Sequence, residues 1–381
     1  MSELLSPALA SACKSRQSLL QQALKSGHVD ALLLGNEKDI QYLTGFVGHE
    51  SLAMVALQSP AAIIISDSRY DEYLQPWRKT GAAEIVMGIR HRLPEAVRQV
   101  CESRRIKRLG VQAEHLTILG KAKLAAAVGA ERLVETAGLV GALRMKKDAV
   151  EVAALRRAID VAQQGVAAAV EKIGIGMTEN EFSALLEYEV KMRGSQAASF
   201  TPIIGAGVNS SIIHHSTGST PIQPGALLVD WGAMVDGLCS DLTRTFGIGE
   251  MPRKLREVYA VVLEAQLAAI DAIAPGKTCA EIDAVARNRI TKAGYGEFFG
   301  HGLGHGLGMD VHEEPYFNDL STNVRLEPGM VMTVEPGVYL PGVGGVRIED
   351  DVLVTDDGVD VLSDWPKDLE SMIVETAAAR A

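Results

Sequence analysis

Short apolar runs recur through the first 140 or so residues and alternate with segments of helical periodicity. A run of four to six apolar residues is typical of a buried strand, whereas apolar residues spaced three and four apart predict an amphipathic helix. We therefore expect strands at residues 30–34, 52–57, 61–65, 84–87 and 108–111, and helices near residues 14–27, 92–105 and 116–128. This alternation predicts an α/β domain. Because it contains no glycine-rich phosphate loop and no cluster of histidines and carboxylates, we expect a structural or oligomerisation role for it.

The pattern changes near residues 143–148, where Ala, Val and Leu at helical spacing predict one long helix that extends to Ile173. We place a domain boundary there and divide the chain into residues 1–145 and 146–381. The length of 381 residues agrees with this division, since domains typically contain roughly 100 to 200 residues.

The second domain contains an internal repeat. Residues 176–182 and 276–282 share the pattern Gly-x-Thr-x-x-Glu followed by an apolar residue, 100 positions apart. Thr followed by Glu three residues later predicts a helix start with a capping box. In both cases an amphipathic helix, a segment with Gly and His, and strands carrying acidic residues follow in the same order. We therefore expect two related half-domains.

Composition and charge exclude several classes of protein. Apolar residues make up 47% and charged residues 22% of the chain, which is typical of a folded globular protein. The net charge is -11 and no strong basic cluster is present, so we expect no nucleic-acid partner. Four cysteines without C-x-x-C spacing favour a reducing compartment over a disulfide framework or a structural zinc site. With no basic signal-peptide region and no uninterrupted apolar span, we expect a cytoplasmic protein without a membrane segment.

Two acidic residues lie in predicted strands of the first half-domain. Asp230 ends the strand expected from Gly225, and Asp241 lies within the strand expected at residues 238–246, with a turn at residues 236–237, so a hairpin would bring the two carboxylates side by side. Each Asp alone would more often be a strand-end or turn residue. Two carboxylates buried together, however, repel each other and need protons or a cation.

The second half-domain adds histidines and further acids. His301, His305 and His312 lie within a glycine-rich segment, and an extended chain would direct His301 and His305 to the same side. Imidazole is both a common metal ligand and an acid/base group, so this segment is more readily explained by function than by packing. Glu335 and Glu349 occupy positions in later strands where the hydrophobic pattern favours a core residue.

Together these residues predict a metal centre formed by Asp230, Asp241, His305, Glu335 and Glu349. Four carboxylates and one imidazole suit two divalent ions of the Mn, Co or Fe kind better than one tetrahedral structural zinc. We expect Mn, with Co, Fe or Zn as alternatives. Two such ions can share a hydroxide that acts as a nucleophile at neutral pH, so hydrolysis is the expected chemistry.

Several segments also resemble a known family. They are residues 230–232 (DWG), 240–246 (SDLTRTF), 301–306 (HGLGHG), 312–315 (HEEP), 334–339 (VEPGVY) and 346–350 (VRIED). These resemble the pita-bread metallopeptidases of the aminopeptidase P and prolidase branch. Residues 30–33, 42–46 and 67–70 resemble the creatinase/prolidase N-terminal domain, so the resemblance covers nearly the whole chain. It implies an α/β N-terminal domain and an α+β pita-bread catalytic domain, in which helices cover an antiparallel sheet of two related halves.

The resemblance implies a dinuclear centre held by the five residues above, with Asp241 and Glu349 bridging the ions. It also implies substrate-facing or supporting roles for His214, His301, His312, Tyr339 and Arg347. His312 would hydrogen-bond the tetrahedral intermediate, and His301 would line the substrate pocket. His215 stands where a Tyr is common and remains an alternative to His214. Compared with the usual strand of that family, one residue is missing between Gly225 and Asp230, which leaves the strand register there open.

The activity implied by the resemblance is cleavage of the bond between an N-terminal residue and proline. Such a bond is a tertiary amide without an N–H, so peptidases that grip substrate amides lose a contact there. We expect a peptide substrate with proline at its second position and a homodimeric enzyme. Two alternatives are a non-catalytic binding module on the same fold and an aminopeptidase of other specificity, such as a methionine aminopeptidase. The presence of all five ligands argues against a non-catalytic module, and the large N-terminal domain argues against an aminopeptidase of other specificity.

Overall fold

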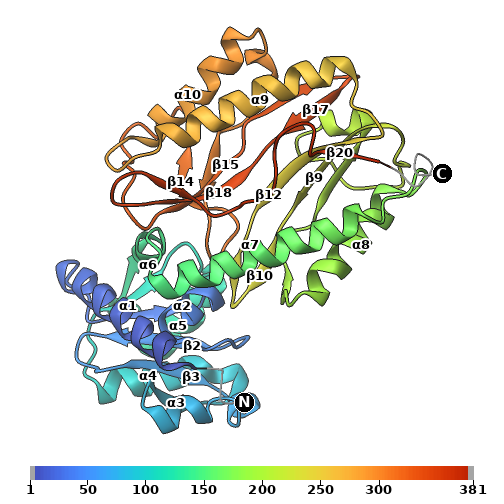
Figure 1. The fold of residues 1–381 in the computed structure, drawn as a ribbon. Coiled ribbons are helices and arrows are strands. Elements are labelled where there is room, and N and C mark those ends of the chain that lie inside the picture. The colour runs from blue at the N-terminus through green and yellow to red at the C-terminus, as the bar shows by residue number, and fades with distance from the viewer. Residues whose placement is uncertain (1–4, 376–381) are drawn as a thin grey trace. The chain divides into compact units, whose positions relative to one another are not determined.

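The computed structural model describes residues 5–375 and divides into two compact units, Met1–Arg144 and Met145–Ala381 (Figure 1). Each unit has its own helices and its own sheets. Within residues 5–375, no helix is long and apolar enough to cross a lipid bilayer. All four cysteines are buried, and none of them forms a disulfide within residues 5–375.

The first unit is built on a mixed six-stranded sheet with the strand order β4-β3-β2-β1-β5-β6. Its strands are β1 (Ala31–Leu34), β2 (Leu52–Ala56), β3 (Ala62–Ser66), β4 (Ala83–Met87), β5 (Leu109–Gln112) and β6 (Leu133–Thr136). Its helices are α1 (Pro7–Ser26), α2 (Glu37–Thr44), α3 (Gln75–Thr80), α4 (Leu93–Ser103), α5 (Ile118–Val128) and α6 (Leu139–Arg144). The α/β fold class predicted for this part of the chain is confirmed.

The five predicted strands are present, and β6 was missed. Its residues are only partly buried and Glu135 is exposed, so the strand gives a weak hydrophobic signal. Helix α1 starts earlier than predicted. Ser6 caps it by accepting a hydrogen bond from the Leu9 amide (3.2 Å), and Pro7 follows at the first helical position, where its missing N–H costs nothing.

The second unit contains four long helices and several small sheets. The helices are α7 (Ala149–Val170), α8 (Glu179–Met192), α9 (Arg253–Ala272) and α10 (Cys279–Lys292). The strands of the first half are β7 (Ala197–Ala198), β8 (Ile203–Ala206), β9 (Gly225–Trp231), β10 (Ala233–Val235), β11 (Leu238–Cys239) and β12 (Leu242–Ile248). Those of the second half are β13 (Gly304–Gly306), β14 (Glu313–Phe317), β15 (Val331–Val334), β16 (Gly337–Leu340), β17 (Gly344–Arg347), β18 (Asp350–Val354), β19 (Val359–Val361) and β20 (Ile373–Val374). In Figure 1 the strands lie between the α7/α8 pair and the α9/α10 pair.

The long helix predicted from the domain boundary to Ile173 is confirmed as α7, which ends at Val170. Helix α6 ends at Arg144 and α7 begins at Ala149, so residues 145–148 separate the two helices. Asp148 starts the new helix with a capping box, in which its side chain accepts from the Glu151 amide (3.0 Å) and Glu151 reaches back to the Asp148 amide (3.2 Å). The acidic cap therefore fixes the start of α7 within the region where the sequence placed it.

The internal repeat predicted from the sequence is present in the structure. Thr178 and Thr278 both form capping boxes with the Glu three residues later, at the starts of α8 and α10. Each Thr also forms an isolated antiparallel bridge with a residue that precedes the next long strand, Pro221 in the first half and Arg325 in the second. In both halves, therefore, the helix starts with the same capping box, and its Thr pairs with the segment that leads into the next long strand.

Strands β9 and β12 form the predicted hairpin, extended by β10 and β11, and its turn lies at Asp236 and Gly237, which have positive φ angles of 53° and 79°. The β9–β12 register is unbroken, which answers the question of register near Asp230. The expected side-by-side pairing is wrong in detail, because Asp230 lies opposite Thr243 and Asp241 directly precedes β12. The two carboxylates are therefore offset along the hairpin.

A buried ionic network connects residues 365–367 to strands and a helix of the second unit. Arg244 is fully buried, and its Nη2 donates to Asp350 Oδ1 (2.8 Å) and to the carbonyl of Trp365 (2.9 Å). The other Asp350 oxygen accepts from Gln266 Nε2 (2.7 Å) and from Lys367. The hydrogen bonds therefore join β12, β18, α9 and the segment after β19.

Replacing Arg244 should strongly destabilise the protein. We expect Arg244→Met to lower the free energy of unfolding by roughly 3 to 5 kcal/mol, because it leaves the buried carboxylate of Asp350 with reduced compensation. Denaturant unfolding of the variant measures this loss. Arg253→Met is the control: the Arg253 side chain is 94% exposed, so its substitution should change stability by less than about 0.5 kcal/mol. A loss below about 1 kcal/mol for Arg244→Met would contradict a structural role for this network.

Candidate active site

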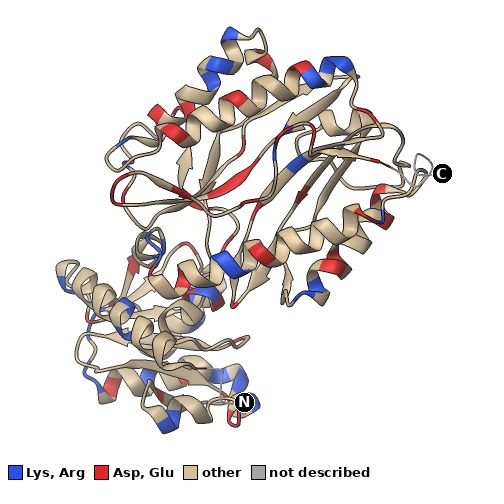
Figure 2. Cartoon of the chain, in the orientation of Figure 1, with Lys and Arg blue, Asp and Glu red and all other residues tan. Residues whose placement is uncertain are grey.

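A cavity of about 380 Å³ lies in the second unit and is lined by residues of both halves. Of the ten residues singled out from the sequence, nine line this cavity: His214, Asp230, Asp241, His301, His305, His312, Glu335, Arg347 and Glu349. The tenth, Tyr339, lies against two of the others, since its hydroxyl is 2.8 Å from His301 Nε2 and 2.9 Å from Arg347 Nη1. Acidic positions lie on the inner strands of this unit as well as on its helices (Figure 2).

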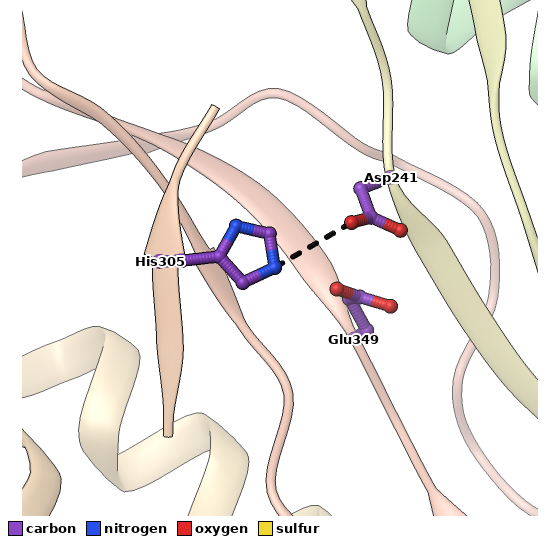
Figure 3. Close-up of side chains that lie close together, drawn as sticks. All are labelled: Asp241, His305 and Glu349. Atoms are coloured by element: carbon purple, nitrogen blue, oxygen red, sulfur yellow. Dashed lines mark ion pairs between the residues drawn. The ribbon is translucent and has the colours of Figure 1, made fainter. Parts of the chain in front are cut away.

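The tightest group consists of Asp241, His305 and Glu349, whose potential ligand atoms all lie within 4.8 Å of one another. Figure 3 shows the three side chains pointing toward one another from three separate segments of the chain. His305 Nε2 lies 3.6 Å from Asp241 Oδ2 and 3.3 Å from Glu335 Oε1. One imidazole therefore faces carboxylates from both half-domains.

Glycines on each side of His305 allow this close packing. A Cβ on Gly304 would lie 2.1 Å from the Thr333 carbonyl oxygen, and one on Gly306 would lie 2.4 Å from the Glu314 carbonyl oxygen. Neither distance is sterically allowed, so β13 can lie between its neighbours only because both positions lack a side chain. The glycine-rich character of this segment is therefore a packing requirement of the strand that carries His305.

Asp230 is held by Arg347. Arg347 Nη2 donates to Asp230 Oδ2 (2.5 Å), while Arg347 Nε donates to Thr243 Oγ1 (3.1 Å). Thr243 in turn donates to Glu349 Oε2 (2.6 Å), so one chain of hydrogen bonds connects two of the predicted ligands. The guanidinium partly compensates the negative charge of the cluster and fixes the direction of the Asp230 carboxylate.

The carboxylates of the cluster titrate far from their usual range. Burial, followed by repulsion from neighbouring carboxylates, raises the pKa values of Asp241 and Glu349 well above their usual values. Burial also raises the pKa of Asp230, despite the opposing charge of Arg347. For Glu335, burial acts upward but is outweighed by the hydrogen bond and charge of His305, which lower its pKa to about 2. Without a cation, the cluster thus favours protonation of several of its acids.

The donor set fits divalent cations. Asp230 Oδ1 is buried and has no hydrogen-bond partner among residues 5–375, which is costly for a carboxylate oxygen unless something else coordinates it. The surrounding donors are carboxylate oxygens and one imidazole nitrogen, the set that hard or borderline divalent ions prefer. Bound cations would compensate the charge that otherwise raises these pKa values.

Metal removal should make stability depend on pH in a defined direction. A carboxyl whose pKa is higher in the folded protein than in the unfolded chain stabilises the fold fully below its unfolded pKa, and this stability is lost as the pH rises through the folded pKa. Asp241 and Glu349 are such groups, with ordinary pKa values of 3.8 and 4.5. The melting temperature of chelator-treated protein should therefore fall as the pH rises above the ordinary pKa values of these groups, and added Mn²⁺ should restore it. A melting temperature that rises over this range of pH would contradict the assignment of these acids.

The remaining histidines surround the same cavity. The rings of His305 and His312 lie 4.4 Å apart between centroids in an edge-to-face arrangement. Burial is the main cause that lowers the pKa values of His301 and His312. His214 lines the cavity, whereas the His215 side chain points to Glu179, with Nε2 2.9 Å from Glu179 Oε2. Of the two adjacent histidines, the one that faces the cavity is therefore His214.

Sequence reasoning missed the residues that support the cluster. Thr243 holds Glu349, and the Thr333 hydroxyl accepts from the His305 amide (3.0 Å). Asp351 accepts from the Asp241 amide through Oδ2 (3.1 Å). Strand alternation offers a signal for Thr243 and Asp351, since each lies two positions after a predicted ligand and so faces the same side of its strand. The apolar wall was also missed: Phe200, Ile203, Ile213, Val311 and Phe317.

Comparison with known proteins agrees with this fold and site. The sequence pattern of metallopeptidase family M24 matches residues 153–356, and that of the creatinase/prolidase N-terminal domain matches residues 16–146. The chain therefore belongs to metallopeptidase family M24 and carries a creatinase/prolidase N-terminal domain.

Individual relatives cover nearly the whole chain. An uncharacterized peptidase of Bacillus subtilis, YqhT, is 37% identical over 342 residues, which are 90% of this chain and 95% of that protein. The solved structure of an Xaa-Pro dipeptidase from Bacillus anthracis is similar with a TM-score of 0.88 at 36% identity, covering 95% of this chain and 99% of that one. An X-Pro aminopeptidase from Thermotoga maritima gives a TM-score of 0.83 at 31% identity, covering 92% of this chain and 98% of that one. The pita-bread fold and the metallopeptidase class predicted from the sequence are thereby confirmed.

Proposed function

We propose that this metallopeptidase hydrolyses the peptide bond between an N-terminal residue and proline. The observation that carries the proposal is the convergence of four carboxylates and His305 from both half-domains in one cavity with an apolar wall. Relatives named Xaa-Pro dipeptidase and X-Pro aminopeptidase support the choice of substrate. A proline ring is apolar and brings no N–H, so an apolar wall suits it better than a row of hydrogen-bond acceptors.

Asp230, Asp241, His305, Glu335 and Glu349 would hold two divalent ions. When bound, such ions polarise the carbonyl of the scissile bond and provide a nucleophile at neutral pH. Oxygen donors with a single nitrogen favour Mn, with Co, Fe or Zn as alternatives. Arg347 would direct the Asp230 carboxylate at the site, and Tyr339 would orient His301 through their 2.8 Å contact.

His312 and His214 would act on the substrate itself. An imidazole N–H beside the scissile carbonyl stabilises negative charge that develops only in the transition state, and we assign this to His312. His214, on the first half-domain, would bind the substrate from another part of the cavity wall, and His301 would contribute to the same pocket. In these roles each imidazole binds the substrate or donates a hydrogen bond to it. None of them forms a covalent bond to the substrate.

Two properties of the whole protein complete the proposal. The four buried cysteines, which form no disulfide within the described residues, support a cytoplasmic location, since reducing compartments keep thiols reduced. We also propose a homodimer, which light scattering of the purified protein tests directly.

A peptide panel tests the proposed activity. With Mn²⁺ or Co²⁺ loaded, we expect turnover of Gly-Pro or of Gly-Pro-Xaa peptides and little turnover of the matched control Gly-Leu. Preference between the first two distinguishes a dipeptidase from an aminopeptidase. Release of the first residue from Gly-Leu but not from the proline peptides would favour an aminopeptidase of other specificity. No turnover of any peptide by protein with two bound metals would favour a binding module.

A further inference from the structure

Glu179 is a fully buried carboxylate outside the metal cluster, at the first position of α8. Its Oε1 accepts hydrogen bonds from the Ala206 amide and from Asn209 Nδ2, both at 2.9 Å. Its Oε2 accepts from His215 Nε2 (2.9 Å) and from the Gly218 amide (3.0 Å). Although burial acts in the opposite direction, these hydrogen bonds lower the pKa of Glu179. The carboxylate is therefore ionised and fully coordinated by donors.

All four donors belong to one segment, residues 206–218. The same segment carries His214, which lines the cavity, and Ile213, which forms part of its apolar wall. His215, next in sequence, points the other way, to Glu179. The buried Glu179 carboxylate thus connects the start of α8 to both ends of this segment. It also holds His215, the residue next to His214.

The second half-domain shows that the fold itself does not require an acid at this position. The residue equivalent to Glu179, directly after the capping Thr, is Cys279, which is also fully buried. The backbone contacts are the same, since the Glu179 amide donates to the Thr220 carbonyl and the Cys279 amide to the Val324 carbonyl, both at 3.0 Å. A small apolar side chain therefore suffices for the helix start, and the buried charge of Glu179 needs another reason.

The second half-domain uses a different acid for its own histidine segment. Asp283 of α10 accepts from the Leu303 amide (3.0 Å) and pairs with Arg287, whose Nη2 donates to the His301 carbonyl (2.8 Å). In both halves, then, a buried carboxylate on the second helix holds the main chain of a segment that delivers a histidine to the cavity.

We propose that Glu179 and His215 are positioning residues, which hold the segment 206–218 so that His214 faces the substrate. The inference rests on the proposed role of His214. Hydrogen bonds to an ionised carboxylate are roughly twice as strong as neutral ones, and a substrate-binding side chain must be held within about 0.5 Å of its working position. The pair acts through His214 and does not itself touch the substrate.

Kinetics of His215 variants test this on the metal-loaded enzyme, with whichever panel peptide the wild type cleaves best. His215→Phe removes the donor and should lower kcat/KM by roughly 10-fold to 100-fold, as expected for a displaced binding group. His215→Gln should stay close to wild type, because its amide nitrogen can occupy the place of Nε2 and donate to Glu179. Metal content should remain unchanged in both variants, which separates mispositioning of His214 from damage to the metal centre.

A double-mutant cycle provides the decisive result. In the His214→Ala background, His215→Phe should cause no further loss, because the residue it positions is already absent. Asp283→Asn is the matched control, a buried acid that holds the other segment, and its effect should persist in that background. An additive effect of His215→Phe, a normal rate for His215→Phe alone, or disappearance of the Asp283→Asn effect would overturn the positioning role. If His214→Ala alone is without effect, the role proposed for His214 fails as well, which is a distinguishable outcome.

Discussion

Asp241→Ala should abolish metal binding and peptide hydrolysis together. Asp241 belongs to the tight group with His305 and Glu349, and it is the member that directly precedes β12 at the centre of the site. Its removal takes away one ligand and one negative charge, and the remaining donors no longer compensate two divalent cations. Metal analysis after dialysis should show fewer than two ions per chain, and activity should fall to background.

The surface variant Asp271→Ala is the control for this experiment, because Asp271 is an exposed residue on α9. It should keep the metal content and rate of the wild type. If Asp241→Ala binds two metals per chain and retains the full rate, the assignment of the metal centre is wrong.

His312→Ala should give the opposite combination, in which the metals remain and the chemistry is slowed. His312 lines the cavity beside His305 but is not a member of the tight ligand group. If it stabilises the developing oxyanion, its loss should lower kcat by roughly 10²-fold to 10³-fold with a smaller change in KM. Steady-state kinetics with metal analysis of the same preparation measure both quantities.

His91→Ala serves as the matched control, since His91 is exposed and lies in the N-terminal unit. It should leave both parameters unchanged. An unaltered kcat for His312→Ala would remove His312 from the mechanism.

Much of the fold was predictable because its signals are local. Strands such as β1 and β3 are continuous apolar runs, and the capping boxes at Thr178 and Thr278 mark two helix starts by residue type alone. The cluster was predictable for a different reason. Acidic residues such as Glu349, which lies between β17 and β18 and not within a strand as expected, interrupt apolar runs of the sequence, and burial of a carboxylate requires a compensating partner.

The parts that were missed depend on tertiary contacts. The exact start of α7 depends on the capping contacts of Asp148, because the apolar pattern places the helix start only within residues 143–148. Likewise, the offset of Asp230 from Asp241 follows from the register of β9 with β12, in which Asp230 lies opposite Thr243. The contact between His215 and Glu179 joins residues 36 positions apart, so no local pattern indicates it.

A competition assay tests the proposed function most directly. Equimolar Leu-Pro and Leu-Ala are incubated with the wild-type protein, once loaded with two Mn²⁺ per chain and once stripped by a chelator. We predict that the loaded enzyme consumes Leu-Pro well ahead of Leu-Ala and that the stripped enzyme consumes neither. Equal consumption of both peptides, or consumption of Leu-Pro without bound metal, would contradict a metal-dependent, proline-specific peptidase.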